Sequence, residues 1–356
     1  MSASRLLLIL FLSSLAALAS CVRSGKTPGT SDSTAVKDSS LSGGAKLERT
    51  AELVRLAMHG NKGDSFAYVL TSFQDVTMTR DSSVEKSRQR MAYRYRFDVL
   101  ETSDDGSSRL RVTCLGMKFK GEYSSNGESK TMQYDSGEKN DPAKDKQFAQ
   151  YNAPVNAPFE IQLSKEGKIE TVSKYEEVIK RLLGKEFNTI KQEARQKIAN
   201  DFAEHGLKDI VQTAFQKLED RPLGVDSAWH HLWAGDLGFM KIRNDATYTL
   251  KGFSKGDHGR LAHISAVMTS KYIGSKTLDT GQGMATVEDF DVKGSGATVF
   301  DIEKGRPDSR TLPQTIHVRF FIDPPAELKQ AAPDQAKGFR ITQNATVEST
   351  VEKIAL

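Results

Sequence analysis

The stretch Tyr93–Leu115, YRYRFDVLETSDDGSSRLRVTCL, decides the fold of this chain. From Tyr93 to Val99, apolar residues alternate with arginine and aspartate, and the alternation returns from Leu110 to Cys114. A period of two is typical of a β-strand with one buried face. Between the two runs, Gly106 can adopt the left-handed backbone of a tight turn. The stretch therefore predicts an antiparallel hairpin.

The same alternation extends on both sides of this hairpin. It is found at Val54–Met58, Phe66–Leu70, Thr131–Tyr134, Phe159–Leu163 and Lys168–Val172, and it resumes after Pro222 and continues to the end. Gly167 separates the last two of these runs and favours a second hairpin turn. We expect an N-terminal β-rich half over residues 46–172 and a C-terminal β-rich half over 220–356.

A helical segment separates the two halves. Apolar residues recur there at steps of three and four, which predicts one apolar stripe on a long helix; they are Tyr175, Ile179, Leu182, Leu183, Phe187, Ile190, Ala194, Ile198 and Phe202. Ser173 and Glu176 have the spacing of a capping box, and Gly184 would allow a bend. His205-Gly206 suggests a stop, after which the spacing resumes from Leu207 to Leu218. The predicted helical segment covers residues 173–219.

A faint internal repeat links the two halves. Residues 95–114 resemble residues 248–267, since each stretch begins with tyrosine, passes a Gly/Asp turn and continues through Arg-Leu. The alternative is that any two amphipathic hairpins look alike. We expect an α+β fold with two antiparallel sheets, built as related curved half-barrels, and the helical segment packed against one of them.

Residues 1–20 are typical of a signal peptide, with Arg5 ahead of the apolar run Leu6–Leu12. The run is too short to span a bilayer comfortably. It leads to Leu18–Cys21 (LASC), which resembles the lipobox of bacterial lipoproteins. The resemblance implies cleavage before Cys21, a diacylglycerol on its sulfur and further acylation, for example with palmitate. The alternative is a secretory signal cut near Ala19, with Cys21 a free thiol.

Residues 21–45 are rich in Ser, Thr, Gly and Asp, so we expect the lipidated cysteine to be followed by a flexible tether. Two or three acyl chains would anchor the protein to a membrane without spanning it. Val22 follows the cysteine where enteric inner-membrane lipoproteins carry aspartate, which favours the outer membrane. We expect a lipid-anchored protein of the bacterial cell envelope, facing the periplasm or the cell surface.

Composition excludes several other classes of protein. The 356 residues include 50 basic and 46 acidic side chains, for a net charge of +4, and both signs are mixed along the chain. Nucleic-acid binding usually shows as a clustered basic stripe, so none is expected. Of the 2 cysteines, Cys114 remains without an intramolecular partner once Cys21 is acylated, and its strand-like setting predicts a small buried side chain.

No motif for catalysis, nucleotide binding or metal binding is found, so we expect a non-enzymatic protein without cofactor or metal. His230 and His231 are adjacent and would point to opposite faces of a strand, where they cannot share an ion. Trp229 and Trp233 could contact a ligand, although filling the core is their more common role.

The mature chain also resembles a family of uncharacterised bacterial lipoproteins. The likeness is carried by Lys62–Asp64 before a strand, Tyr134–Ser136 before an acidic loop, Pro158–Ile169 with its hairpin, and Pro222 leading to Asp226–Trp229. The resemblance implies envelope location and a β-rich build, and it implies no catalytic residue.

Together these observations predict a membrane-anchored envelope protein with a structural or interaction role. One alternative is a carrier that binds an apolar or lipidic ligand between sheet and helix, for which Leu183, Phe187 and Ile190 on the helical stripe are the candidate face. Another is an envelope hydrolase without a recognisable motif. The expected partners are the membrane, through the anchor, and a lipid or an envelope protein.

Overall fold

The computed structural model describes residues 47–356, except 82, 238–239, 258, 280–283 and 325–337. The predicted signal peptide, Cys21 and the tether lie outside the described residues. Within the described part, no helix is both long enough and apolar enough to cross a bilayer.

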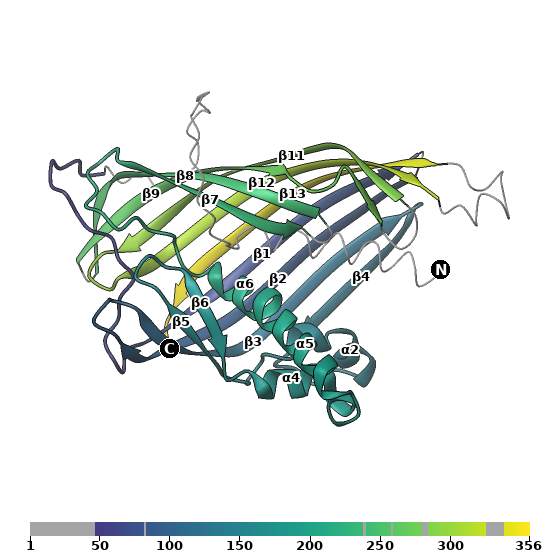
Figure 1. The fold of residues 1–356 in the computed structure, drawn as a ribbon, viewed down its shortest axis with the longest axis horizontal. Helices are drawn as coiled ribbons and strands as arrows, with labels where there is room; N and C mark the ends of the chain where they lie inside the picture. The colour runs from purple at the N-terminus through teal and green to yellow at the C-terminus, as the bar shows by residue number, and fades with distance from the viewer. Residues whose placement is uncertain (1–46, 82, 238–239, 258, 280–283, 325–337) are drawn as a thin grey trace.

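The strands form one antiparallel sheet whose main path runs β6-β5-β3-β2-β1-β13-β12-β11-β9-β8-β7, with β4 paired to β3 and β10 to β11 (Figure 1). Their bounds are β1 Ser65–Arg80, β2 Ser83–Thr102, β3 Ser108–Ser125, β4 Glu128–Asp135, β5 Phe159–Leu163, β6 Ile169–Ser173, β7 Ala228–Leu237, β8 Met240–Gly256, β9 Gly259–Tyr272, β10 Thr277–Asp279, β11 Met284–Asp301, β12 Arg306–Asp323 and β13 Phe339–Ile354. The predicted antiparallel, β-rich class is confirmed.

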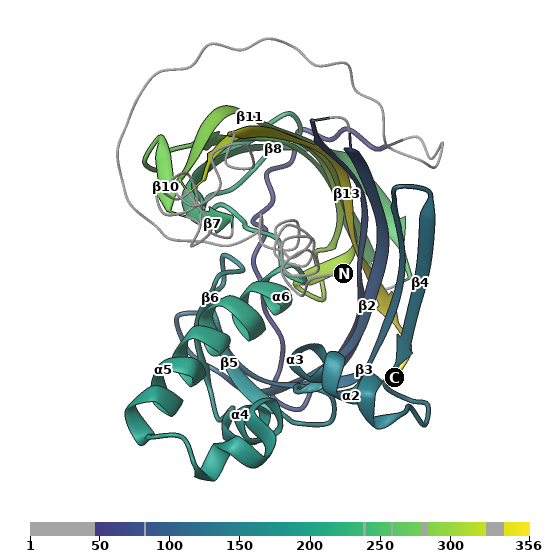
Figure 2. The ribbon, with the colours of Figure 1, turned by 90° about the vertical axis from the view of Figure 1, so that its right-hand side faces the viewer.

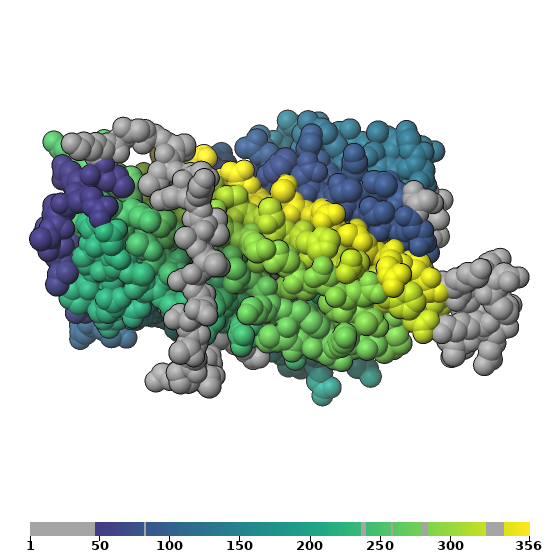
Figure 3. All heavy atoms as spheres, turned by 90° about the horizontal axis from the view of Figure 1, so that it is seen from above, coloured from purple at the N-terminus to yellow at the C-terminus, as the bar shows by residue number. Residues whose placement is uncertain are grey.

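The two β-rich halves share this single sheet and do not form the two separate sheets that we expected. The junction is the long pairing of β1 with β13, from Ala67 opposite Ile354 to Arg80 opposite Ile341. Figure 3 shows the yellow C-terminal strand lying between the green strands and the blue N-terminal strands. Pairing these strands removes two exposed sheet edges, which are otherwise sites of unwanted association.

The sheet is curved but does not close, because β6 and β7 stand at opposite ends of the strand order without pairing. Seen along the strands, it bends around an interior, and the helices lie on its open side (Figure 2). The chain leaves the edge strand β6, passes through these helices and enters the other edge strand, β7. The helical connection therefore bridges the opening.

The hairpin of β2 and β3 shows how the sequence dictates the sheet. Tyr93, Tyr95 and Phe97 are buried on the inner face, whereas the arginines between them are exposed on the outer face. At the turn, Gly106 has φ +85° and its N–H donates to the Ser103 carbonyl. The prediction of a hairpin from the alternating run is confirmed. The similar stretch at residues 248–267 falls on the hairpin of β8 and β9.

The alternating run Val54–Met58 does not become a strand of the sheet. Its three apolar side chains are buried, but Val54 makes only an isolated bridge to Leu223. A short extended segment that packs on a sheet face has the same apolar pattern as a sheet strand, since the pattern records burial and not pairing.

The helical segment is confirmed, but it is broken and shorter than predicted. Its α-helices are α4 Glu176–Leu183, α5 Gln192–Phe202 and α6 Asp209–Gln212, and the smaller α2 Pro142–Gln147 and α3 Ala149–Asn152 precede them. Ser173 cannot cap α4 because it pairs with Glu160 at the end of β6. Gly184, with φ +53°, ends α4, and a π-helical turn through His205 and Gly206 joins α5 to α6 where we expected a stop.

Beyond α6 the chain leaves the helix and crosses the interior of the sheet. We name residues Gln212–Leu218 the crossing segment. The apolar spacing predicted a helix to residue 219, yet α6 ends at Gln212. Phe215 on this segment packs edge-on against Phe97 of β2, with ring centroids 5.4 Å apart. The crossing segment thus belongs to the main core, which also contains side chains from both halves.

A second apolar cluster lies farther along the inner face. Its described members all lie on strands, namely Val76, Met240, Ile242, Val287, Val292, Ile316, Val318, Phe320, Ala345 and Val347. Strand register places them on the same face as the main core, since Val292, Ile316, Ala345 and Val76 are successive cross-strand neighbours. In the described part of the chain, the main helix contacts with the sheet are to β3 and β6, at a distance in strand order from this cluster.

Candidate ligand-binding cleft

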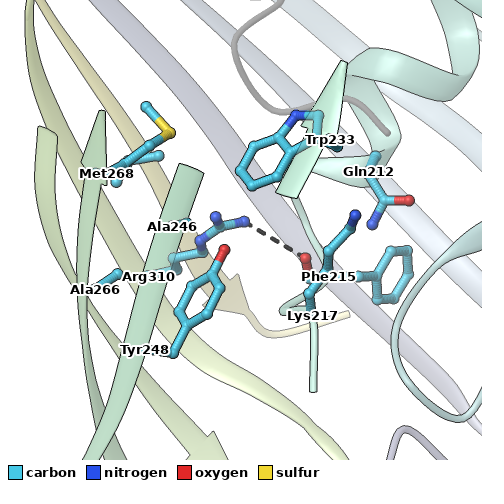
Figure 4. Close-up of a pocket in the computed structure, with 10 residues that line it drawn as sticks. Gln212, Phe215, Lys217, Trp233, Ala246, Tyr248, Ala266, Met268 and Arg310 are labelled. Carbon is cyan, nitrogen blue, oxygen red and sulfur yellow. Dashed lines mark hydrogen bonds between the residues drawn. The ribbon is translucent and has the colours of Figure 1, made fainter. Parts of the chain in front are cut away.

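The inner face of the sheet and the crossing segment enclose a small cleft, with a cavity volume of about 20 Å³. It is lined by Gln212, Phe215, Lys217, Trp233, Ala246, Tyr248, Ala266, Met268, Arg310 and Leu312. Figure 4 shows the strand side chains facing those of the crossing segment across this space. A concave, largely apolar site with a few polar groups is the usual form of a small-molecule site.

The hairpin of β5 and β6 holds one side of the crossing segment. The Gln212 side chain accepts a hydrogen bond from the Ile169 N–H at 2.8 Å and donates to the Gly167 carbonyl at 2.7 Å. Gly167 has φ +80°, and a Cβ at this position would lie 2.0 Å from the Gln216 carbonyl oxygen. Only glycine fits this turn, both for its backbone conformation and for the close approach of the crossing segment.

Strands of the C-terminal half hold the other side. Arg310 donates to the carbonyls of Thr213 and Phe215 at 3.1 and 3.4 Å, the second of which is the dashed line in Figure 4. Thr298 donates to the Gln216 side chain at 2.9 Å, and the Trp229 indole donates to the Lys217 carbonyl at 3.2 Å. The crossing segment is therefore fixed to both walls of the curved sheet.

Two cations lie in the lining of the cleft. They are Lys217 and Arg310, and the described lining residues include no acid. The Lys217 ammonium lies 5.1 Å from the centre of the Trp233 ring, in cation–π geometry. Burial lowers the pKa of nearby His231 to about 4, and the charge of Lys217 acts in the same direction.

Several buried polar side chains beside the cleft have a polar atom without a hydrogen-bond partner. On neighbouring strands these include the Trp233 Nε1 donor and the Asn244 Nδ2 donor. Farther around the inner face they include the Oε1 acceptors of Gln74, Gln314 and Gln343. A buried polar atom without a partner costs about 1–3 kcal/mol, so each such group needs a reason to be retained.

The second apolar cluster begins next to the cleft. Along β8, the inner face presents Tyr248 and Ala246 in the cleft, then Asn244, then Ile242 and Met240 in the cluster. Along β12, the inner face passes from Leu312 in the cleft to Ile316 in the cluster. The cleft and the buried cluster therefore lie next to each other on the inner face, with a polar row between them.

The candidate face predicted from the helical stripe does not contribute to the lining of this cleft. Leu183 ends α4, Phe187 lies in a 3-10 turn and Ile190 lies in the loop before α5; all three are half-buried. Phe187 packs under the Arg195 guanidinium, 4.6 Å from the ring centre. Cys21, the predicted lipidation site, lies outside the described residues.

The structure also shows the burial and contacts of the other residues that the sequence analysis named. Cys114 is buried, as predicted, and burial raises the pKa of its thiol to about 12, so it is not a nucleophile at neutral pH. His230 is exposed and 2.5 Å from Asp245, whereas His231 is partly buried, which confirms that they occupy opposite faces of β7. Within the described residues, no group of three or more His, Cys, Asp or Glu side chains could hold a metal ion.

Sequence reasoning found one wall of the cleft and missed the other. Trp229 and Trp233 were recognised as aromatic residues with two alternative roles, and Trp233 does both, since it is buried and lines the cleft. The crossing segment was missed because its apolar spacing fits a helix. The available signal was the run of Gln212, Gln216 and Lys217 within an otherwise apolar stretch, since buried glutamines need backbone partners.

A family of unknown function, DUF6263, matches residues 105–306, more than half of the chain. The chain belongs to this family. The match contains most of the cleft, from the hairpin of β5 and β6 through the crossing segment to β9. The predicted membership of an uncharacterised family is confirmed. Comparison with curated proteins gives no match.

Several solved structures are distantly similar to this DUF6263 member. Lipovitellin is 9% identical and matches 83% of this chain with a TM-score of 0.45, and the chain spans 25% of lipovitellin's length. OpdL of Pseudomonas aeruginosa is 9% identical over 82% of this chain and 99% of its own, with a TM-score of 0.20. An outer membrane channel of Pseudomonas putida F1 is 8% identical over 83% and 98%, with a TM-score of 0.21. Scores this low do not define a shared fold.

Proposed function

We propose that this protein is a lipid-anchored, non-enzymatic protein of the bacterial cell envelope that binds an apolar or lipidic ligand on the inner face of its sheet. The observation that carries the proposal is the position of the cleft beside the second apolar cluster, a buried, strand-built part of the inner face. A dry core would be expected to end where the helices end. Here the apolar inner face continues past them.

The anchor is the second part of the proposal, and the sequence supports it through Leu18–Cys21. Acyl chains on Cys21 would hold the folded body near a bilayer, where lipidic ligands are concentrated. Replacing Cys21 with Ser and labelling the cells with radioactive palmitate tests the anchor. We expect Cys21→Ser to abolish labelling with radioactive palmitate, and undiminished labelling would contradict acylation at this residue.

A cleft-filling variant tests the binding site. Ala266 lines the cleft from the inner face of β9, so Ala266→Leu should fill it without adding charge. Ala234→Leu is the matched control, because Ala234 is exposed on β7. With the purified full chain, we expect the apolar dye N-phenyl-1-naphthylamine to bind the wild type and Ala234→Leu, and to bind Ala266→Leu at least about tenfold more weakly. Equal binding by all three, or no binding, would contradict the proposal.

A further inference from the structure

We infer that the outer face of β2 and β3 docks on the surface of an anionic phospholipid bilayer. This surface lies on the opposite side of the sheet from the cleft, so the inference goes beyond the proposed function and takes from it only the envelope location. Anionic phospholipids fit this face because their head groups form a layer of negative charge above an apolar interior.

The exposed side chains of this face are almost all cations. Over residues 86–96 of β2 and 111–120 of β3, exposed positions on the outer face alternate with buried positions on the inner face. In Figure 2 the outer side of β2 faces away from α5 and α6. Every exposed side chain in these two stretches except Leu115 is basic. We name these cations the basic face; they are Lys86, Arg88, Arg90, Arg94, Arg96, Arg111, Lys118 and Lys120.

Acidic side chains neutralise half of the basic face. The ion pairs are Arg88 with Asp75, Arg96 with Asp98, Lys118 with Asp135, and Lys120 with Glu122. Within the part of the chain that the structure describes, Lys86, Arg90, Arg94 and Arg111 form no ion pair. These four charges equal the net charge of +4 of the whole chain, so the excess of positive charge is concentrated here.

Cations of the basic face lie next to one another. Arg90 is directly opposite Lys120 in the register of β2 and β3. Asp135 raises the pKa of Lys118, whereas the nearby charge of Arg94 acts in the opposite direction. Like charges in directly opposite positions destabilise a sheet. A negatively charged partner would relieve this repulsion, which gives a reason for the chain to keep it.

An exposed apolar side chain distinguishes a bilayer from other anionic partners. Leu115 of β3 is 37% exposed and precedes Gly116, which lies opposite Arg94. Surfaces that lie on bilayers combine cations with apolar side chains that enter the head-group layer. The phosphates of a nucleic acid would also attract the cations, but they offer Leu115 no apolar layer.

The predicted anchor would bring this face within reach of a bilayer. A tether over residues 21–45 would span about 25–30 Å, so the folded body could turn until one surface meets the membrane. Attraction between the leaflet and clustered cations would select the basic face for that contact. Beyond β1 the charge changes sign, because β13 places Glu348 and Glu352 opposite Phe73 and Val69.

Vesicle flotation with the full Cys21→Ser chain tests the inference without acyl chains on this residue. The probes are vesicles of phosphatidylcholine alone and vesicles of equal parts phosphatidylcholine and phosphatidylglycerol. We expect at least about tenfold tighter binding to the anionic vesicles, as the summed attraction of several surface cations allows. The preference should weaken as the salt concentration rises, because salt screens exposed charges.

Paired variants assign this binding to the basic face. Combining Arg90→Gln with Arg94→Gln should weaken binding to the anionic vesicles at least about fivefold. Combining Lys185→Gln with Lys197→Gln removes the same charge from exposed positions of the helical connection and should bind as the parent chain does. Thermal unfolding should show that neither pair lowers stability, since all four side chains are exposed.

A fluorescent label then locates the contact. Leu115→Cys in the Cys21→Ser chain supplies an accessible thiol, because Cys114 is buried. A nitrobenzoxadiazole label at this thiol should brighten and shift to shorter wavelength on anionic vesicles. The same label on Lys197→Cys should keep its emission in water.

Three results would overturn the inference and leave the proposed function standing, because dye binding and palmitate labelling test that function separately. The first is equal binding to both kinds of vesicle, or to neither. The second is undiminished binding by the Arg90→Gln, Arg94→Gln chain, or no change in the label on Leu115→Cys. The third is binding of duplex DNA that this variant abolishes, without binding to anionic vesicles, which would make a nucleic acid the partner.

Discussion

Single glycines control how closely the crossing segment can approach the sheet. Gly167 combines a left-handed backbone, at φ +80°, with a contact that leaves no room for a side chain against the Gln216 carbonyl. Gly63 offers the comparison, because its φ is +93° and nothing lies within 4 Å of the position that a Cβ would take there. The two positions separate backbone strain from close packing.

We expect Gly63→Ala to lower the free energy of unfolding by about 1–2 kcal/mol, which is the cost of a left-handed alanine. Gly167→Ala should cost at least about 3 kcal/mol, since the hairpin must also move away from the crossing segment. Urea unfolding of both variants measures the difference. Equal losses would show that the contact between Gly167 and Gln216 is not tight.

His231 makes the stability of the fold depend on pH. Burial lowers its pKa to about 4, whereas an unfolded chain titrates near its ordinary value of 6.5. The unfolded state therefore binds the proton first, so this contribution is present above pH 6.5 and is lost as the pH falls toward 4.

We expect the wild type to lose about 1–2 kcal/mol more unfolding free energy between pH 7.5 and 4.5 than His231→Phe, which does not titrate. Urea denaturation at the two pH values provides the measurement. The same pH dependence in both proteins would mean that His231 accepts its proton without disturbing the fold.

At the scale of elements, the helical connection divides into a structural part and a part that builds the site. Val178 in α4 is fully buried in the main core, whereas Phe187 is half-buried beneath Arg195. The crossing segment after α6, and not the stripe at Leu183, Phe187 and Ile190, faces the cleft.

Charge substitutions distinguish these parts. Phe187→Asp should leave dye binding unchanged and cost no more than about 1.5 kcal/mol of stability, because the new carboxylate can pair with Arg195. Val178→Asp should destabilise by more than about 3 kcal/mol, since it buries a charge. Thermal unfolding and dye titration measure both effects. A loss of dye binding in a folded Phe187→Asp protein would restore the stripe as the ligand face.

The sequence predicts elements well where one face is buried, and poorly where the chain is held by long-range hydrogen bonds. The hairpin from Tyr93 to Leu115 was predictable because alternation and turn residues agree. The end of α6 was not, because the Gln212 side chain bonds the backbone of a distant hairpin and Arg310 holds the carbonyls that follow. Val54–Met58 was wrongly predicted as a strand because its buried apolar residues alternate in the same way as those of a strand.

At the scale of the molecule, the chain makes one open sheet and bridges its opening with its own connection. The sequence predicted two related halves, and each of the two similar stretches forms a hairpin of neighbouring strands. It could not indicate that β1 would pair with β13, since strands in either one sheet or two have the same alternating pattern. That single pairing produces the long curved inner face on which the second apolar cluster lies.

The central claim is that this inner face holds a lipidic ligand. The most direct test is native mass spectrometry of the full chain released from the membranes of a bacterial host, with lipid extraction after unfolding. We predict a non-covalent adduct of lipid mass that is released on unfolding, is lost in Ala266→Leu and persists in Ala234→Leu, while acyl chains on Cys21 remain covalently attached. A wild-type protein that carries no releasable lipid would contradict the claim.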